Sequence, residues 1–321
     1  MATTNSTIEK IAPMFTELLV KKIECLKTDW QKPWITSLEQ GLPRNIRGTL
    51  YNGGNVLMLL FYTEFMKFTL PVFLTFNQAK EEDLSVCKGA RSFPVYYWFK
   101  FVVHKETKKT IKYEEYRKLP ATEQENYKVI SQMKYYNVFN IDQTDFAGKY
   151  PERYERMKKG EQPEDYSDGM IYEALDELVY LQNWYCPIKV QYSDSAYYSP
   201  SSDHIVCPQR EQFPQGAEYY GTLLHEMAHS TGSPQRLNRT FGCFFGDALY
   251  AREELVAELT AALCGAFFGY AAAPQDNNAA YLKHWLTKLK EEPAFLVEIL
   301  GDVNKAAKMI ADKVTEPVNE P

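Results

Sequence analysis

Two histidines four residues apart, with a glutamate directly after the first, are the residues best suited to metal chemistry in this sequence. His225, Glu226 and His229 lie in the segment GTLLHEMAHSTG. On a helix, a spacing of four residues places both imidazoles on one face, where a single Zn²⁺ ion can join them. Glu226 is then positioned to act as a general base on a water molecule at the cation. The pattern predicts a catalytic metal site.

The residues around this motif favour a helix. Leu223, Leu224, Met227 and Ala228 supply an apolar face, and no proline interrupts the segment. Gly232 follows at a position where a left-handed residue commonly ends a helix. We therefore expect the motif helix to end at Gly232 in that conformation.

A catalytic site of this kind needs a third protein ligand, since the motif alone also arises by chance in amphipathic helices. A histidine six residues after His229 is excluded, because position 235 is glutamine. The segment REELVAELTAALCGAFF instead carries three acids in an otherwise apolar helix: Glu253, Glu254 and Glu258. An uncompensated carboxylate there would be costly, and a nearby cation removes the cost.

Glu254 and Glu258 share one helix face, because four residues make just over one turn. We assign Glu254 as the third ligand and Glu258 as the acid that orients a histidine ligand through its ring N–H. Glu253, rotated by about 100° from Glu254, is free to face solvent. An exchange of roles within this triplet remains open.

Two histidines and one glutamate leave a fourth position for water, which is the arrangement of catalytic rather than structural zinc. We expect one Zn²⁺ per chain and hydrolysis of a peptide bond, with an oxyanion donor nearby. The sequence does not rank the candidate donors, and for His204 the favoured interpretation is an ordinary strand histidine. The candidates are Tyr219, Tyr220, His204, Tyr250 and Arg236.

The elements that must position these residues fall into two regions. Apolar periodicity and β-branched or aromatic runs predict helices and strands before and after a charged, Gly- and Pro-containing segment at 147–169. In the first region we expect helices at 8–28 and 55–66, a strand turning into a helix at 72–83, and strands at 92–106 and 134–142. In the second we expect helices at 170–185, around the motif, at 252–268 and at 278–290, with strands at 187–193 and 203–208.

This pattern predicts an α+β fold of two domains, in keeping with 321 residues. The predicted boundaries are a first domain at 1–145, a linker at 146–169, a second domain at 170–313 and a tail at 314–321. Residues 1–130 hold 19 Lys and Arg against 14 Asp and Glu, and the rest hold 17 against 28. This asymmetry is a weak indication that a polyanion-binding module is joined to an acidic one.

Other features narrow the setting. The sequence lacks a signal-peptide pattern and an apolar stretch long enough to span a bilayer, so we expect a cytoplasmic protein without a membrane partner. Six cysteines occur without any CxxC pair, which favours reduced thiols over a disulfide framework.

The combined motifs resemble the ArdC-type antirestriction family. The segments PQRLNR, FGDALYAREELVAEL and DHIVCP carry the resemblance in the second half, and WQKPW, GLPRNIRGTLYNGGN, LTFNQA, VCKGARSFPV and YYNVFNIDQT carry it in the first. The resemblance implies an N-terminal domain that binds single-stranded DNA and a C-terminal zincin-like metallopeptidase domain. It also implies a gene on a mobile element and a role in protecting incoming DNA from host restriction. The chain departs from the family at Ser233, where relatives often carry histidine.

The first region contains the mixture of cationic and aromatic residues that single-stranded DNA binders use. For each tryptophan alone, packing in the core is the competing interpretation. We expect the segment VYYWFKF to form a buried strand rather than a binding face. The candidate DNA-binding residues are Trp30, Lys32, Trp34, Arg44, Arg47, Tyr51, Lys88 and Arg91.

Two other functions remain open at this point. One is a non-enzymatic DNA-coating protein whose metal site only stabilises the fold. The other is a metallopeptidase that acts on a host regulatory protein, with a first domain that binds protein. No sequence feature identifies a protein substrate.

Overall fold

A computed structural model of the chain describes residues 2–26, 33–35, 38, 40–159, 172–242, 248–270 and 282–315. Trp30 and Lys32, two of the candidate DNA-binding residues, lie outside these ranges. The described residues form a mixed helix and sheet structure, which confirms the predicted α+β fold class.

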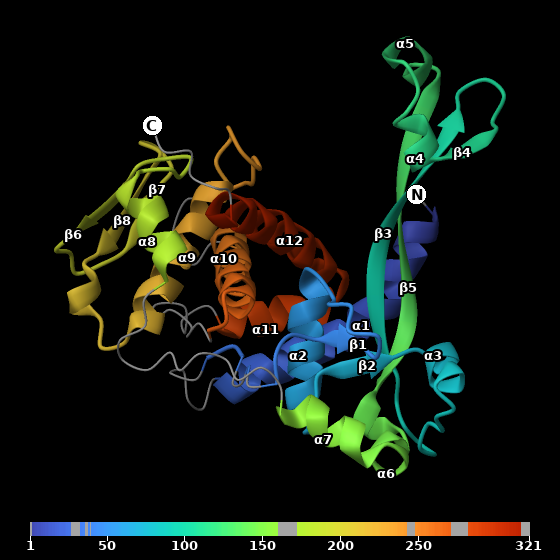
Figure 1. Cartoon of the computed structure of the whole chain (residues 1–321). Coiled ribbons are helices and arrows are strands. Elements are labelled where there is room, and N and C mark those ends of the chain that lie inside the picture. The colour runs from blue at the N-terminus through green and yellow to red at the C-terminus, as the bar shows by residue number, and fades with distance from the viewer. Residues whose placement is uncertain are drawn as a thin grey trace.

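The first half of the chain forms a five-stranded sheet in the order β1-β2-β5-β3-β4. β3 and β5 pair antiparallel over twelve residues of each, so together they make a long hairpin that projects away from the helices (Figure 1). Helices α4 (Tyr113–Tyr116) and α5 (Ala121–Gln124) lie at its tip. The strands are β1 (Arg44–Asn45), β2 (Val72–Leu74), β3 (Phe93–His104), β4 (Thr110–Lys112) and β5 (Tyr127–Asn140).

Two helices join this sheet to the rest of the molecule. α1 (Ala2–Leu26) packs on β5 and buries Ile11, Phe15, Leu19 and Ile23, which recur every four residues and therefore form one stripe. α2 (Gly54–Met66) is buried along most of its length, and α3 (Phe76–Glu81) follows β2. These elements match the predicted ones, although α1 begins earlier.

The second half forms a smaller sheet with helices packed beside it. Its strand order is β6-β8-β7, with β6 (Ile188–Gln191), β7 (Tyr197–Ser199) and β8 (His204–Pro208). None of the described helices combines the length and apolarity of a membrane span. The sequence prediction missed β7 and the long last helix. The helices are α8 (Glu173–Tyr180), α9 (Gly216–Thr231), α10 (Ala248–Phe267), α11 (Leu282–Glu291) and α12 (Ala294–Thr315).

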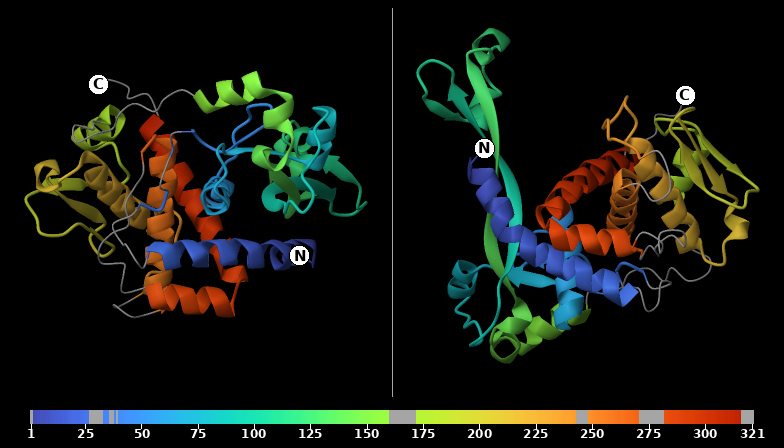
Figure 2. Two further views of the ribbon diagram at one scale, coloured as in Figure 1. Left: turned by 90° about the horizontal axis from the view of Figure 1, so that it is seen from below. Right: turned by 180° about the vertical axis from the view of Figure 1, so that it is seen from behind.

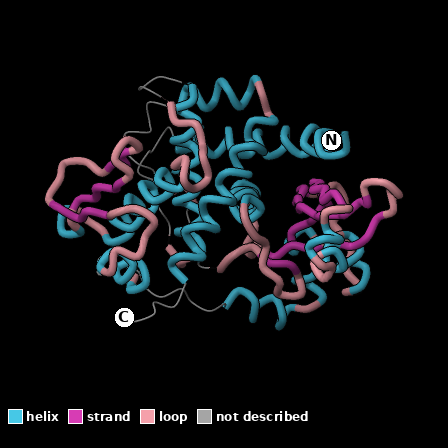
Figure 3. The backbone as a smooth tube through the Cα atoms, turned by 90° about the horizontal axis from the view of Figure 1, so that it is seen from above, coloured by secondary structure: helices cyan, strands magenta, loops and turns pink. Residues whose placement is uncertain are grey.

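One hydrophobic cluster spans both halves of the chain. It contains buried side chains of α1, α2, β3 and β5 together with those of α8 to α12. α1 packs against α11 and α12, and α2 packs against α10 and α12, as the views from below and behind show (Figure 2). The helices therefore gather between the two sheets, which lie on opposite sides of them (Figure 3). The two predicted domains share a core.

Part of the predicted linker is folded. Residues 146–159 form α6 (Phe146–Lys149) and α7 (Pro151–Lys159), while 160–169 lie outside the described residues. Phe146 is fully buried in a second, smaller cluster with side chains of β2 and α3, and Tyr150 and Tyr154 pack against it. The charged composition of this segment reflects helix faces turned to water around one aromatic anchor.

Asn304 of α12 adds polar contacts to the apolar packing between α12 and the first half. The Asn304 side chain accepts a hydrogen bond from the Gly54 amide at 2.5 Å and donates to the Tyr96 hydroxyl at 3.2 Å. Gly54 has no space for a side chain, since an added Cβ would lie 2.7 Å from that hydroxyl oxygen. The start of α2, strand β3 and α12 therefore meet at one polar point within the shared core.

Replacement of Asn304 tests whether the halves fold together. Asn304→Ala leaves the amide of Gly54 without its acceptor, so we expect a loss of about 1–3 kcal/mol in the free energy of unfolding. Urea denaturation followed by circular dichroism should show one transition, shifted to lower urea, while Asn137→Ala at an exposed position of β5 leaves it in place. Two separate transitions would contradict the shared core.

Candidate metal centre and nucleic-acid surface

Helices α9 and α10 pack against each other and carry the predicted metal residues. His225, Glu226 and His229 lie in the second half of α9, and Glu254 lies in the first half of α10. The His225, Glu226 and Glu254 side chains are buried, and that of His229 is only slightly exposed. The spacing of four residues places both imidazoles on the face of α9 that meets α10.

Three ligand atoms converge between these helices. The Nε2 atoms of His225 and His229 are 3.1 Å apart. Each lies 3.5 Å from a different carboxylate oxygen of Glu254. At metal–nitrogen distances of about 2.0–2.1 Å, tetrahedral geometry separates two ligand atoms by roughly 3.3 Å. The residues present thus fit a divalent cation held by two nitrogens and one carboxylate.

Glu253 is buried rather than facing solvent as the sequence suggested. Its side chain is 3% exposed, and its Oε1 atom lies 3.3 Å from His229 Nδ1. Arg239 donates two hydrogen bonds to the same carboxylate, at 2.6 and 2.9 Å, and also bonds Thr231 and the Ala228 carbonyl of α9. The guanidinium compensates the buried charge, so Glu253 can orient His229 through its second ring nitrogen.

Glu258 lies on the other side of the site. Its Oε1 atom is 3.7 Å from His225 Nδ1, and its Oε2 atom accepts a hydrogen bond of 2.7 Å from the indole N–H of Trp34. Trp34, predicted to contact DNA, is instead fully buried against Phe61 of α2. Its ring is therefore not available to stack on a base, and the competing interpretation of core packing describes it.

The three ligands favour positive charge between them. Burial lowers the pKa of His225, but the hydrogen bond to Glu254 and the surrounding carboxylates outweigh it and raise this pKa to about 9. Burial raises the pKa of Glu254, but His229 and His225 together lower it to about 2. A cation takes the place of the protons that these histidines otherwise carry.

Glu226 differs from Glu254 in the direction in which the folded protein shifts its pKa. Burial raises its pKa, while His225, His229 and a backbone hydrogen bond at Tyr198 of β7 act in the opposite direction. A carboxylate with a raised pKa beside a cation site is suited to accept a proton near neutral pH. The geometry is consistent with the predicted general base.

Gly232 ends α9, but not in the predicted left-handed conformation. Its backbone is right-handed, with φ −76° and ψ −10°. A Cβ atom at this position would lie 2.9 Å from Arg239 Nη2 and 2.7 Å from Phe241. Glycine is therefore required by space, because a side chain would displace the guanidinium that holds Glu253.

Among the candidate oxyanion donors, Tyr250 lies at the site, where a side-chain hydrogen bond connects it to Glu254. Tyr220 instead donates to Asp176 at 2.8 Å. Arg236 is paired with Asp203, and His204 with Ser202. Tyr219 is buried against neighbouring rings.

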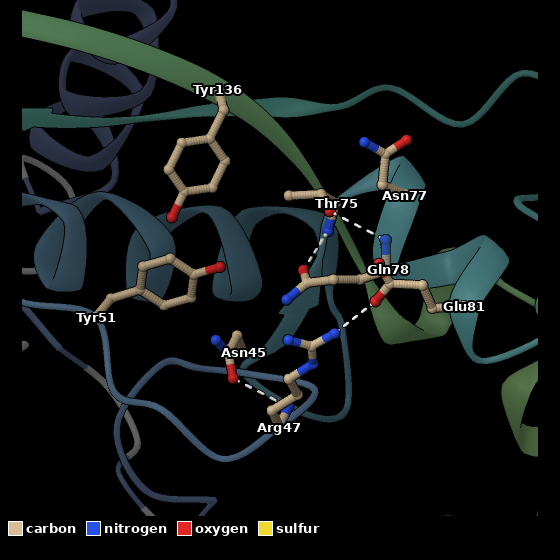
Figure 4. Close-up of a pocket in the computed structure, with 8 residues that line it drawn as sticks. All are labelled: Asn45, Arg47, Tyr51, Thr75, Asn77, Gln78, Glu81 and Tyr136. Atoms are coloured by element: carbon tan, nitrogen blue, oxygen red, sulfur yellow. Dashed lines mark hydrogen bonds and ion pairs between the residues drawn. The ribbon is translucent and has the colours of Figure 1, made fainter.

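Apart from Trp34, the described DNA-binding candidates occupy two places in the first half. Arg47 and Tyr51 line a pocket of about 360 Å³, shown with all its residues in Figure 4. Arg44 is close to these residues in sequence and is half-buried. Its guanidinium donates a hydrogen bond to the Gln40 carbonyl at 3.0 Å, and burial lowers its pKa. Lys88 and Arg91 are exposed in the loop before β3.

The pocket combines aromatic rings with polar side chains. The hydroxyls of Tyr51 and Tyr136 interact, and Arg47 pairs with Glu81 at 2.5 Å (Figure 4). Asn45 and Gln78 use their side-chain oxygens to accept backbone N–H groups. Within the described structure, their amide nitrogens donate no hydrogen bond, which leaves donors for a ligand.

An aromatic stripe continues from this pocket along the hairpin. It consists of Tyr136 of β5 and Tyr97, Phe99 and Phe101 of β3, with successive ring centroids 6.0, 6.3 and 5.9 Å apart. The ammonium group of Lys134 lies 4.4 Å from the Phe99 ring centre. The prediction that VYYWFKF is a buried strand holds for Val95 and Tyr96 and is wrong from Tyr97 onward.

Exposure along β3 shows why this prediction failed. Tyr97 is 45% exposed and Trp98 is 53% exposed, and their side chains lie on opposite faces of the hairpin. Both faces are open at this point because only the start of β3, residues 93–96, packs into the core. An uninterrupted aromatic run is typical of a strand buried on both faces, and the lysines within and opposite it were the available signal of exposure. Arg239 was missed as well, although it closes the segment PQRLNR.

Both halves of the chain match described families. Residues 9–139 match the N-terminal domain of anti-restriction factor ArdC, and residues 173–299 match a zincin-like metallopeptidase domain. The crystal structure of Mn(II)-bound antirestriction protein ArdC from plasmid R388 is similar, with a TM-score of 0.66 and 28% identity over 95% of this chain and 98% of that one. The metal-free crystal structure of that protein gives 0.66 and 26%, with 96% and 99% covered.

Three relatives share sequence with most of the chain. Two Escherichia coli proteins named DNA primase TraC are 28% and 29% identical over 95% and 90% of it, but the chain spans only 28% and 19% of their lengths. Uncharacterized protein y4eC of Sinorhizobium fredii is 27% identical over 90% of the chain and 87% of its own length. The similarity therefore extends through both halves, in the same order.

The metal content of two variants distinguishes the proposed ligands from the proposed general base. We expect His229→Ala to lose the cation, because one of three ligands is gone, whereas Glu226→Gln keeps one ion per chain. Elemental analysis after dialysis against Zn²⁺ or Mn²⁺ measures the ratio, and the wild type should gain about 2.7 kcal/mol of stability at a hundredfold excess over Kd. Equal metal content in both variants would place the ion elsewhere.

Proposed function

Because the chain belongs to the ArdC family of antirestriction proteins, we propose that it is a mobile-element protein that protects incoming DNA from host restriction. In this proposal it binds single-stranded DNA with its first half and carries a zinc metallopeptidase-type site in its second. The observation that carries the proposal is the convergence of His225, His229 and Glu254 beside the buried Glu226. We place its action in the cytoplasm, where restriction occurs.

The residues of the site have distinct proposed roles. A bound cation would polarise a carbonyl oxygen and acidify a water molecule. Glu226 would act as the general base, taking a proton from a water molecule and passing it to the leaving amine. Glu253 and Glu258 face the second ring nitrogens of the two imidazoles and would orient them when the cation is bound. Tyr250, bonded to Glu254, is the nearest of the candidate donors for the developing oxyanion.

The donor set supports zinc as the cation. Two imidazole nitrogens and one carboxylate are the protein ligands of many catalytic zinc sites, which keep one position open. Such ligands also accept other divalent ions, since affinity depends on geometry and availability. The relative from plasmid R388 was crystallised with Mn(II). Zinc as the cation of this chain is thus a proposal, and a competition measurement between Zn²⁺ and Mn²⁺ tests it.

The aromatic stripe and the pocket support single-stranded DNA as the partner. Proteins that bind single strands without sequence preference combine stacking rings with cationic side chains along a track. Tyr97, Phe99 and Phe101 offer such rings in series, and Lys134 supplies a positive charge beside them. At the base of the hairpin, Arg47 and the free amide donors of the pocket are suited to a phosphate or a base edge.

Two adjacent aromatic residues provide a matched test of this surface. Tyr97→Ala removes one ring of the stripe, so we expect affinity for an oligo-dT strand to fall roughly 5- to 150-fold, the value of one stacked base. Trp98→Ala removes an equally exposed ring from the opposite face and should leave binding unchanged. Fluorescence anisotropy measures both, and binding should weaken with salt. Equal effects of the two substitutions would reject the stripe.

Glu226→Gln separates the peptidase from a DNA-coating function. If hydrolysis protects DNA, this variant should bind metal and single strands normally but fail to protect unmodified DNA transferred into a restricting host. Glu211→Gln, at an exposed position before α9, should protect like the wild type. Full protection by Glu226→Gln would instead support a non-enzymatic coat with a stabilising metal. Protection without any DNA binding would support a peptidase for a host regulator.

A further inference from the structure

The hydrogen bond between Trp34 and Glu258 joins the first half of the chain to the metal centre. Trp34 lies 224 positions before Glu258 in sequence, and the indole nitrogen donates to Oε2 at 2.7 Å. Both side chains are almost completely buried, at 0% and 2% exposure. A neutral donor therefore solvates a carboxylate that has no access to water.

Glu258 lies in the apolar middle of α10, where a buried carboxylate is stable only if its oxygens are used. The two oxygens face different partners: Oε2 receives the indole N–H, and Oε1 lies 3.7 Å from Nδ1 of His225. Trp34 thus constrains the orientation of the carboxylate, whose Oε1 atom lies toward the histidine. Glu253, by contrast, is held by Arg239.

His225 depends on this arrangement. Its Nδ1 atom is buried and has no hydrogen-bond partner within the described structure. A histidine that binds a metal through Nε2 carries its proton on Nδ1 and almost always donates it to a carboxylate or carbonyl. Glu258 is the carboxylate that faces Nδ1, so its position determines how well His225 is aligned when the cation is bound.

We propose that Trp34 is a positioning residue of the metal centre, acting through Glu258 on His225. The inference rests on the proposed metal site. Trp34 itself is held against Phe61 of α2, at 6.3 Å between ring centres. The region matched to the N-terminal ArdC domain therefore completes the metal centre of the other half, and the second half alone would bind its cation more weakly.

Metal affinity of Trp34→Phe tests the proposal. The substitution keeps an aromatic ring and removes the N–H donor, so we expect the Zn²⁺ Kd, measured by competition with a chromogenic chelator, to rise about 10- to 100-fold. Trp285→Phe is the matched control, because its buried indole donates to a backbone carbonyl of α10 at Ala251. It should lower thermal stability without changing the Kd.

A double-mutant cycle identifies the route. If Trp34 acts through Glu258, then adding Trp34→Phe to Glu258→Gln weakens Zn²⁺ binding little beyond Glu258→Gln alone. Additive effects, or a wild-type Kd in Trp34→Phe, would overturn the inference. Absence of Zn²⁺ and Mn²⁺ binding in the wild type would instead overturn the proposed metal centre itself.

A measurement on the wild-type protein covers the case in which Trp34→Phe does not fold. The indole N–H resonance of Trp34, assigned by its contacts to Phe61, should shift when Zn²⁺ is added, because Glu258 Oε1 then accepts a hydrogen bond from the Nδ1–H group of His225. The indole resonance of Trp285 should stay in place. An unmoved Trp34 resonance would contradict the proposal.

Discussion

Burial of acidic side chains between two packed helices is the constraint on which the rest of the structure depends. A carboxylate removed from water needs a partner, because its desolvation otherwise costs several kcal/mol. Three of these acids have partners other than the histidines: Arg239 for Glu253, Trp34 for Glu258 and Tyr250 for Glu254. Glu254 and Glu226 face the imidazoles and the space between them. The four acids are Glu226, Glu253, Glu254 and Glu258.

This constraint explains features outside the proposed set of metal ligands. Gly232 lacks a side chain because Arg239 occupies that space, and the loop before α2 is drawn against α10 because Glu258 needs a donor. The shared hydrophobic cluster then holds α1 and α2 against α10 and α12. As a result, the half that presents the hairpin surface also contributes to the metal centre. The hairpin surface and the candidate metal centre therefore belong to one structure with a shared core.

Local patterns predicted the side chains that converge between α9 and α10, but not the residues that support them. The spacings of His225 to His229 and of Glu254 to Glu258 are properties of one helix turn, which sequence reveals directly. Arg239 and Trp34 act across loops and across the molecule, so no periodicity reports them. The sequence also did not reveal that much of β3 is exposed, because the exposed part of this strand carries the same kinds of aromatic residues as the buried part. The α12 helix, which closes the shared core, was simply not identified.

The most direct test of this account is anomalous diffraction from crystals of the wild-type protein grown with Zn²⁺ and, separately, with Mn²⁺. The account predicts one strong peak per chain at about 2.0–2.2 Å from His225 Nε2, His229 Nε2 and a Glu254 oxygen. It also predicts that Glu258 and Glu253 each lie within hydrogen-bond distance of a histidine Nδ1 atom. A peak elsewhere, or coordination by Glu226 or Glu258 in place of Glu254, would contradict it.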